Sequence, residues 1–270
     1  MTGCVNMVRT ADYVVVGAGS AGCIVARRLA EAGASVVLLE AGGTDRSRII
    51  RRPGMVTVLH SVPQLKKRFD WGFASTPQTS ALGRRIPQVR GKVLGGSSSI
   101  NGMLFVRGHR QNFDDWAADG CPGWSYADVL DSYKRLENWE EGPSEHRGSS
   151  GPVRVSRVKG LTQASEAFIE ALAHTSGAKK IDDYNGPEQE GVSVFQQSVH
   201  NGLRYSTSVA YLGPDRPADL QVVTDSTVTR VIVKKGRALG VEAITRAGGR
   251  SSMPTGKSCS APGSTVHRSC

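Results

Sequence analysis

The sequence predicts an α/β fold built on a doubly wound, mainly parallel sheet. Three observations predict it: a β-branched and aromatic run at Tyr13–Val16, a glycine turn at Gly17–Gly22, and a second apolar run at Ser35–Leu39. Apolar runs without alternation are typical of strands that are buried on both faces, as in parallel sheets. The amphipathic stretch Cys23–Ala32 between them predicts a helix, so the chain opens with a strand–helix–strand unit.

The glycine turn has the spacing of a dinucleotide-binding site. We expect the first glycine to allow the tight turn, the second to let the backbone approach a pyrophosphate, and the third to let helix and strand pack closely. Free amides at the start of the helix would face the phosphate charge. The residues concerned are Gly17, Gly19, Ser20, Ala21 and Gly22. Glu40, 18 residues after the third glycine, is placed to bind ribose hydroxyls. This turn leaves open whether the dinucleotide is FAD or NAD.

Composition excludes several classes of protein. The chain has 270 residues, 39% of them hydrophobic, which suits one large domain or two small ones and excludes wholesale disorder. Glycine is in excess, at 32 residues. No apolar run approaches the ~18 residues of a membrane span. The net charge of +10 is scattered, its longest run being Lys66–Arg68, so we expect a solvated surface and no nucleic-acid partner.

Cysteine and histidine positions suggest neither a disulfide framework nor a metal site. The five cysteines have no CxxC spacing and no secretory signal precedes them, so we expect a reduced, cytoplasmic protein. The six histidines share no ligand spacing. We interpret His109 as a surface or structural residue rather than an acid–base group.

A second glycine-rich run spans Arg90–Met103. A flexible linker is the alternative, but the apolar residues of the run are expected to anchor it inside the protein: Val93, Leu94, Ile100 and Met103. Its amides would then line something buried. Together with the first turn, this run disfavours a plain NAD-dependent dehydrogenase.

At this run the sequence resembles the glucose-methanol-choline family of flavin oxidoreductases, most closely its choline-dehydrogenase-like branch. The resemblance covers about residues 11–249. Further matching segments follow in the family's order: Glu40–Gly43, Asp70-Trp71, Pro77-Gln78, Asn112–Trp116, Gly123–Tyr126, Tyr184–Gly186 and Gly202–Ser208.

The resemblance implies a bound FAD. Beyond the first turn and Glu40, it implies cofactor contacts for Ala41, Trp71, Arg90, Val93, Gly95, Gly96, Asn101, Gly102, Met103, Leu104 and Val228. In that set the Gly95–Leu104 segment would follow the pyrophosphate and flavin, and the backbone of Val228 would hold the adenine. Some family members attach the flavin through a His where this chain has Ile100, so the resemblance implies non-covalent FAD.

The family reaction oxidises an alcohol by hydride transfer to the flavin, and a His base takes the hydroxyl proton. The resemblance places that His beyond residue 270, so no catalytic residue is assigned. Two functions follow: an FAD-dependent alcohol dehydrogenase or oxidase acting on a small alcohol, or an inactive fragment that at most binds FAD.

The domain organisation follows from the same comparison. We predict the first part of the FAD-binding domain at 11–155, part of an α+β substrate domain at 156–215, and a return to the FAD-binding domain at 216–249. Gly142–Gly151 is expected to be an exposed loop.

The last segment, 250–270, lacks apolar periodicity, and we interpret it as an aberrant tail. If Lys257–Ala261 were encoded by AAG-TCG-TGC-TCA-GCG, the same bases read two positions later would spell Val-Val-Leu-Ser, and on this ground we interpret the tail as the product of a frameshift. A divergent natural tail is the alternative, and the gene sequence decides between them.

Overall fold

The computed structural model describes residues 11–246 and 250–258, the last segment by its backbone. These residues belong to two compact units, Met1–Gly102 with Ser206–Cys270, and Met103–Tyr205. The division differs from the predicted boundaries after residues 155 and 215. The two units are compact bodies, whereas the predicted domains are defined by FAD binding and substrate binding. The assignment of residues to these two functions stays a prediction.

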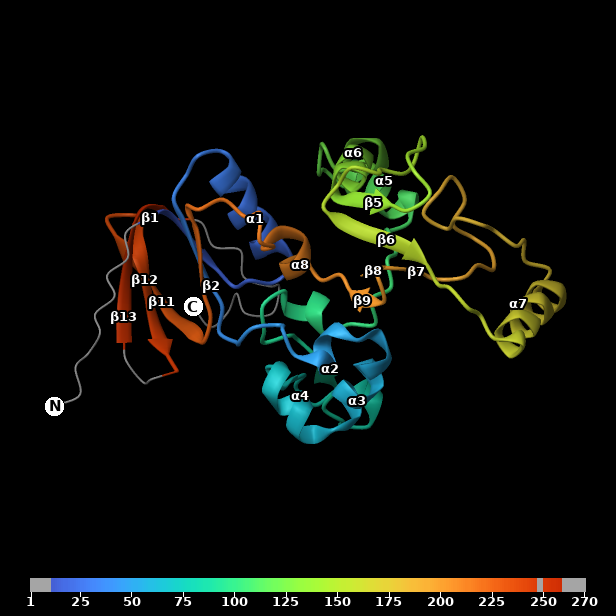
Figure 1. The fold of residues 1–270 in the computed structure, drawn as a ribbon, viewed down its shortest axis with the longest axis horizontal. Helices are drawn as coiled ribbons and strands as arrows, with labels where there is room; N and C mark the ends of the chain where they lie inside the picture. Colours follow the sequence, from blue (N-terminus) through green and yellow to red (C-terminus); the bar gives the residue numbers. More distant parts are fainter. Residues whose placement is uncertain (1–10, 247–249, 259–270) are drawn as a thin grey trace. The chain divides into compact units, whose positions relative to one another are not determined.

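A six-stranded sheet forms the centre of the first unit, in the order β10-β2-β1-β13-β12-β11 (Figure 1). Neighbouring strands from β10 to β13 run parallel, and β11, β12 and β13 form an antiparallel meander. The strands are β1 (Ala11–Val16), β2 (Val36–Leu39), β10 (Leu220–Val223), β11 (Ser226–Lys234), β12 (Arg237–Thr245) and β13 (Arg250–Ser258).

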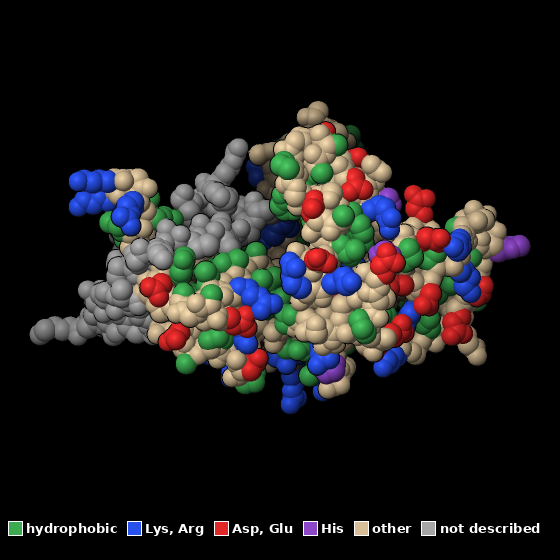
Figure 2. Space-filling view, turned by 90° about the horizontal axis from the view of Figure 1, so that it is seen from above, with side chains coloured by type: hydrophobic (Ala, Val, Ile, Leu, Met, Phe, Trp, Pro, Cys, Tyr) green, Lys and Arg blue, Asp and Glu red, His purple; other side chains and the backbone are tan. Residues whose placement is uncertain are grey.

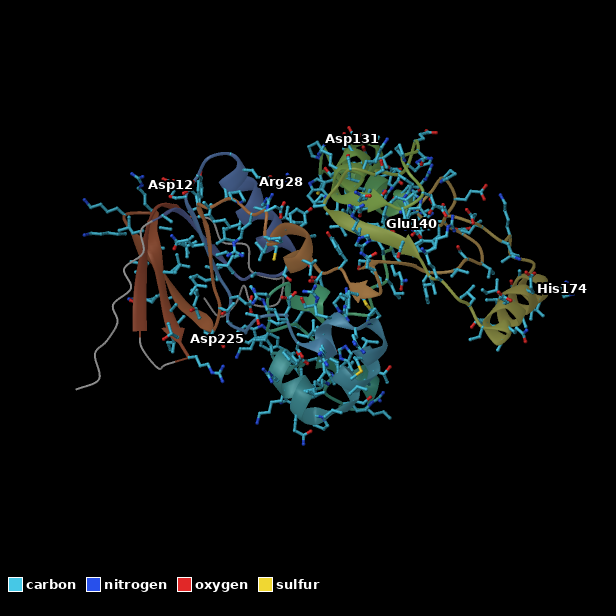
Figure 3. The ribbon with its side chains drawn as sticks, in the orientation of Figure 1. Asp12, Arg28, Asp131, Glu140, His174 and Asp225 are labelled. Carbon is cyan, nitrogen blue, oxygen red and sulfur yellow. The ribbon has the colours of Figure 1, made fainter. Side chains whose placement is uncertain are left out.

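The apolar runs identified in the sequence form the buried strands, as predicted. All four residues of β2 are buried because it lies between β1 and β10. Side chains of β1, β2 and β12 form one core cluster, which contains Val14, Val37, Leu39 and Val241. Asp12 marks the end of the sheet where β1 begins, and Asp225 lies at the opposite end, where β10 has ended (Figure 3).

Strand β13 is a difference from the sequence pattern. Residues from Arg250 onward lack apolar periodicity, yet the backbone of Arg250–Ser258 pairs with β12 on one side and with β1 on the other. Backbone hydrogen bonds between two flanking strands require no apolar side-chain pattern. Residues 259–270 lie outside the described part, and the frameshift interpretation stays a prediction.

Short helices complete the first unit. Helix α1 (Ser20–Glu31) packs beside α8 (Thr207–Tyr211), as Figure 1 shows. Three more helices follow β2: α2 (Arg48–Arg51), α3 (Val56–Ser61) and α4 (Pro63–Phe69). Ile50, Leu59 and Phe69 from these helices form a second core cluster with Val93 and Ile100. The apolar residues of the second glycine run therefore anchor it, as predicted. The short pieces that accompany them are η1 (Pro53–Met55), β3 (Phe73–Ala74), η2 (Thr79–Ala81), β4 (Pro87–Gln88) and η3 (Gly96–Ser99).

The second unit has a small sheet, β5-β6-β7, with helices around it. Its elements are α5 (Arg110–Ala118), α6 (Tyr126–Leu136), β5 (Glu137–Trp139), β6 (Val153–Arg157), α7 (Gln163–Ser176), β7 (Gln196–Gln197), β8 (Val199–His200) and β9 (Leu203–Arg204). Helix α7 covers the predicted helical stretch 164–175. No helix among the described residues has both the length and the apolar character needed to cross a membrane.

The surface agrees with the expectation of dispersed charge. On the face shown in Figure 2, Lys and Arg side chains are interspersed with Asp and Glu. Most ion pairs in the second unit are exposed, such as Lys179–Glu188, and pairs of this kind contribute little to stability.

Gly142–Gly151 is a loop in which Pro143–Glu145 and Ser150 are exposed, as predicted, but its Arg147 belongs to a buried ionic network. Within this segment the Arg147 side chain is only 1% exposed. Its guanidinium donates to Glu137 and Asp183 at 2.9 Å. Glu137 also accepts from Arg107 at 2.6 Å and from the Gly148 amide at 2.8 Å. The local run of Gly, Ser and Pro indicated an exposed loop. The burial of Arg147 depends on Glu137, which lies on β5, outside the segment, and so could not be inferred from the run itself.

We predict that Glu137→Gln destabilises the chain by about 3–5 kcal/mol, because it leaves buried arginine charge without its partner. Glu188→Gln is the matched control, since its exposed pair with Lys179 should contribute less than ~1 kcal/mol. Urea unfolding of the two variants measures the difference. Equal stability of both variants would contradict the role given to the network.

Candidate cofactor site

The glycine turn brings the end of β1 and the start of α1 into backbone contact. Gly17 has a φ of +88°, which glycine adopts readily, and its amide donates to the Leu39 carbonyl at 2.8 Å. A Cβ on Gly22 would lie 1.9 Å from the Gly17 carbonyl oxygen. Only glycine at position 22 permits this approach of helix to strand.

The start of α1 is open. Gly19 is the N-cap, and no side chain among the described residues caps the helix there. A Cβ added to Gly19 would meet no described atom within 4 Å. The first amides of a helix lack partners within the helix and carry partial positive charge. Ser20 and Ala21 are exposed at this end. The geometry therefore suits a phosphate group placed against the backbone.

The second glycine run packs directly on the first. The Gly95 amide donates to the Ala18 carbonyl at 2.7 Å. A Cβ on Gly96 would lie 2.7 Å from the Gly19 Cα, and one on Gly91 would lie 2.3 Å from the Gly96 carbonyl. Both glycines of the pair 95–96 have positive φ, +83° and +54°. Two loops that are far apart in the sequence thus meet with no side chain between them.

Glu40 lies at the end of β2 with only 5% of its surface exposed. Its carboxylate accepts from the Ala18 amide at 2.9 Å and from the Gly42 amide at 2.8 Å, one bond on each oxygen. Burial raises the pKa of Glu40 to about 6, and these amides and the charge of Lys92 oppose the rise. Each oxygen retains a lone pair that can accept a hydroxyl.

A recess opens beside these loops at the carboxyl end of β2, where ligands bind in open α/β sheets. We call it the sheet-end recess. Its volume is about 800 Å³, and Ala41, Gly42, Gly43, Lys92, Asp225 and Thr227 are among its lining residues. Gly42 permits the local packing, since a Cβ there would lie 2.0 Å from the Lys92 carbonyl oxygen.

The remaining expected residues fall into three groups. Trp71 and Arg90 lie together, since the Trp71 amide donates to the Arg90 carbonyl at 3.0 Å, and the Trp71 ring stacks on Phe73. Val228 lies on β11 and packs against the main core cluster. Asn101 and Gly102 end the first segment of the first unit, and Met103 and Leu104 belong to the second unit.

The structure adds residues that motif reasoning did not select. Ala18 carries no functional side chain, yet its peptide joins Glu40 to Gly95. Cys23 also donates its thiol to the Ala18 carbonyl at 3.2 Å. The only signal was the density of glycines around these positions. His109 has the structural role expected of it, because its Nδ1 accepts from the Gln111 amide at 3.2 Å and caps α5.

A parallel sheet with a glycine turn leading into an uncapped helix defines an α/β protein of the dinucleotide-binding class. The chain belongs to the GMC oxidoreductase family, whose profile matches residues 11–266. It is 43% identical over 233 residues to the oxygen-dependent choline dehydrogenase of Brucella melitensis, covering 86% of this chain and 42% of that protein. The Vibrio vulnificus choline dehydrogenase is also 43% identical, over 235 residues.

Solved structures of other oxidoreductases have a similar fold. Pyridoxine 4-oxidase from Mesorbium loti superposes with a TM-score of 0.84 at 27% identity, over 93% of this chain and 49% of that one. An FAD-dependent oxidoreductase from Chaetomium thermophilum gives 0.82 at 26% identity, over 94% and 45% of the two chains. The chain therefore spans less than half the length of these relatives.

We predict that the pH dependence of stability contains a contribution from Glu40 that Glu40→Gln removes. The raised pKa means that the folded chain binds a proton more readily than the unfolded chain between pH 4.5 and about 6. Stability from this group is therefore lost as pH rises through that window, by about 2 kcal/mol. The free energy of unfolding of wild type, relative to the variant, should fall by that amount between pH 4.5 and 7.5.

Urea unfolding at a series of pH values measures this difference. Gln can accept from only one of the two amides, which lowers the stability of the variant by the same amount at every pH. The change of the difference with pH does not depend on this constant loss. A difference between the two proteins that stays constant with pH would show that Glu40 titrates as an ordinary carboxyl.

Proposed function

We propose that this chain is the cofactor-binding part of an FAD-dependent enzyme that oxidises an alcohol CH–OH group. The observation that carries the proposal is the contact between the two glycine runs beside an uncapped helix start. That arrangement leaves room for a pyrophosphate at Gly19, whereas a Cβ on Gly22, Gly91 or Gly96 would meet backbone atoms. Membership of the GMC family and the FAD-dependent structural relative support FAD rather than NAD.

The residues present fit the cofactor in named roles. The amides of Gly19, Ser20 and Ala21 would hold the pyrophosphate, because the helix start presents partial positive charge there. Glu40 would accept the ribose hydroxyls through its remaining lone pairs. Family resemblance assigns Val228 to the adenine and Asn101–Leu104 to the flavin side. Bound FAD supplies the hydride acceptor.

We also propose that the FAD is held non-covalently. Ile100 stands where some family members carry a flavin-linked His, and its side chain has no nucleophilic atom. The Ile100 side chain is buried in the second core cluster, and the backbone carbonyl of Ile100 lies 2.7 Å from His60 Nε2. This side chain therefore packs and does no chemistry. Flavin that is released intact on denaturation supports this part of the proposal.

A second candidate function is a chain that binds FAD without oxidising an alcohol. Curated relatives that share this segment are more than twice as long. The part of the chain that the structure describes holds no residue to which we assign proton abstraction. The substrate class, a small alcohol such as choline, comes from those relatives and is part of the proposal.

Gly19→Val should weaken FAD binding at least ~30-fold, because a side chain there displaces the pyrophosphate from the backbone. Gly54→Val is the matched control. Gly54 also has no described atom within 4 Å of an added Cβ, but it lies in η1, away from the cradle. Fluorescence titration of the refolded chains with FAD gives the ratio. Equal affinity in both variants would remove the cradle assignment.

The two candidate functions differ in one measurement. The FAD-loaded chain should not be bleached by choline or small alcohols without oxygen, because general-base assistance is worth about 10²–10⁴ in rate and no base is assigned. Anaerobic absorbance at the flavin band records the outcome. Bleaching at ordinary enzymatic rates would exclude the second candidate and would direct the search for a base to His109.

A further inference from the structure

A second recess lies in the first unit, away from the glycine turn. We call it the arginine recess. It is an open recess lined by the loop after β2 and by residues of α2, α8 and β10, and its volume is about 460 Å³. This volume lies within the range of small-molecule sites. Neither Gly17–Gly22 nor Glu40 lines it, although Thr44 lines both this recess and the sheet-end recess, so the two adjoin.

Three arginines line this recess: Arg46, Arg51 and Arg216. None of them forms an ion pair with an acid among the described residues. The Nε of Arg51 is buried and has no hydrogen-bond partner in the described part of the chain. Nitrogens of Arg107 and Arg204 in the second unit are buried in the same way. The three guanidinium charges that line one recess, rather than Arg51 Nε, therefore indicate an anionic ligand.

The one acid lining the recess is already engaged. Asp45 is buried and accepts from the hydroxyls of Ser208 at 2.5 Å and Ser206 at 3.3 Å. Asp215, next to Arg216 in sequence, pairs with Arg27 on α1 at 3.2 Å. Three arginines and one aspartate leave two positive charges facing the recess.

We propose that the arginine recess binds a small molecule that carries a phosphate group. A phosphate monoester dianion balances the two charges, and guanidinium groups match its oxygens with paired hydrogen bonds. Thr224 adds a hydroxyl to the lining, and Leu212 and Val222 add apolar surface for an organic part. The recess is larger than a phosphate ion needs, which favours an organic phosphate over inorganic phosphate.

The test is calorimetric titration of the full chain at constant ionic strength. The probes are glycerol 3-phosphate, inorganic phosphate, and glycerol as the neutral analogue. We expect both phosphates to bind, the monoester more tightly, and glycerol to give no signal. Arg51→Gln should weaken phosphate binding by roughly tenfold or more, as expected for a lost charge-assisted hydrogen bond. Arg52→Gln, the neighbouring exposed arginine outside the recess, should stay within about twofold of wild type.

Two further arms keep the result interpretable. Arg216→Gln changes an exposed arginine of the recess and should weaken binding even where Arg51→Gln fails to fold. FAD is added to a phosphate-saturated sample, because competition would place the phosphate in the glycine cradle and overturn the proposal. Unchanged phosphate affinity in a folded Arg51→Gln or Arg216→Gln variant also overturns it. Wild type that binds no FAD refutes the proposed function alone.

Discussion

The Ala18 peptide is the point at which three segments of the first unit are joined. Its amide donates to Glu40 at the end of β2, and its carbonyl accepts from Gly95 in the second glycine run. These hydrogen bonds fix the turn between β1 and α1 against both neighbours. The glycines at positions 22, 42, 91 and 96 leave no space for a Cβ where the loops meet. These four glycines are therefore explained by contacts between backbones, which a side chain would force apart.

Two buried carboxylates illustrate opposite ways of burying charge. Glu137 in the second unit is matched by two arginine guanidinium groups and an amide. Glu40 has backbone amides as its direct partners, so desolvation dominates and its pKa rises to about 6. Neutral donors offset the desolvation of a buried carboxylate less than cationic partners do. The Glu40 carboxylate is desolvated at the position where it also orders the loop beside the proposed ribose site, through the Ala18 and Gly42 amides.

The sequence predicted the parts of this fold in which local pattern and tertiary environment agree. Buried parallel strands read as continuous apolar runs, so β1 and β2 were evident, and the helix between them followed from its periodicity. Strand β13 was missed because its pairing comes from β1 and β12, on either side of it, and its own side chains carry no pattern. Arg147 was missed for a related reason, since its partners come from other segments, including Glu137 on β5. Glu40 was predicted to bind the ribose hydroxyls. Its hydrogen bond from the Ala18 amide could not be predicted, because it depends on how β2 and the glycine turn lie in the fold.

The net charge of +10 is distributed differently in the two units. In the second unit the arginines Arg107, Arg147 and Arg157 are each bound to carboxylates, so their charge is neutralised within the fold. In the first unit Arg46, Arg51 and Arg216 face one recess whose only acid accepts from serine hydroxyls. Scattered surface charge requires no partner because water solvates it. The three arginines that line this recess have no carboxylate partner among the described residues, and this difference distinguishes them from Arg107, Arg147 and Arg157.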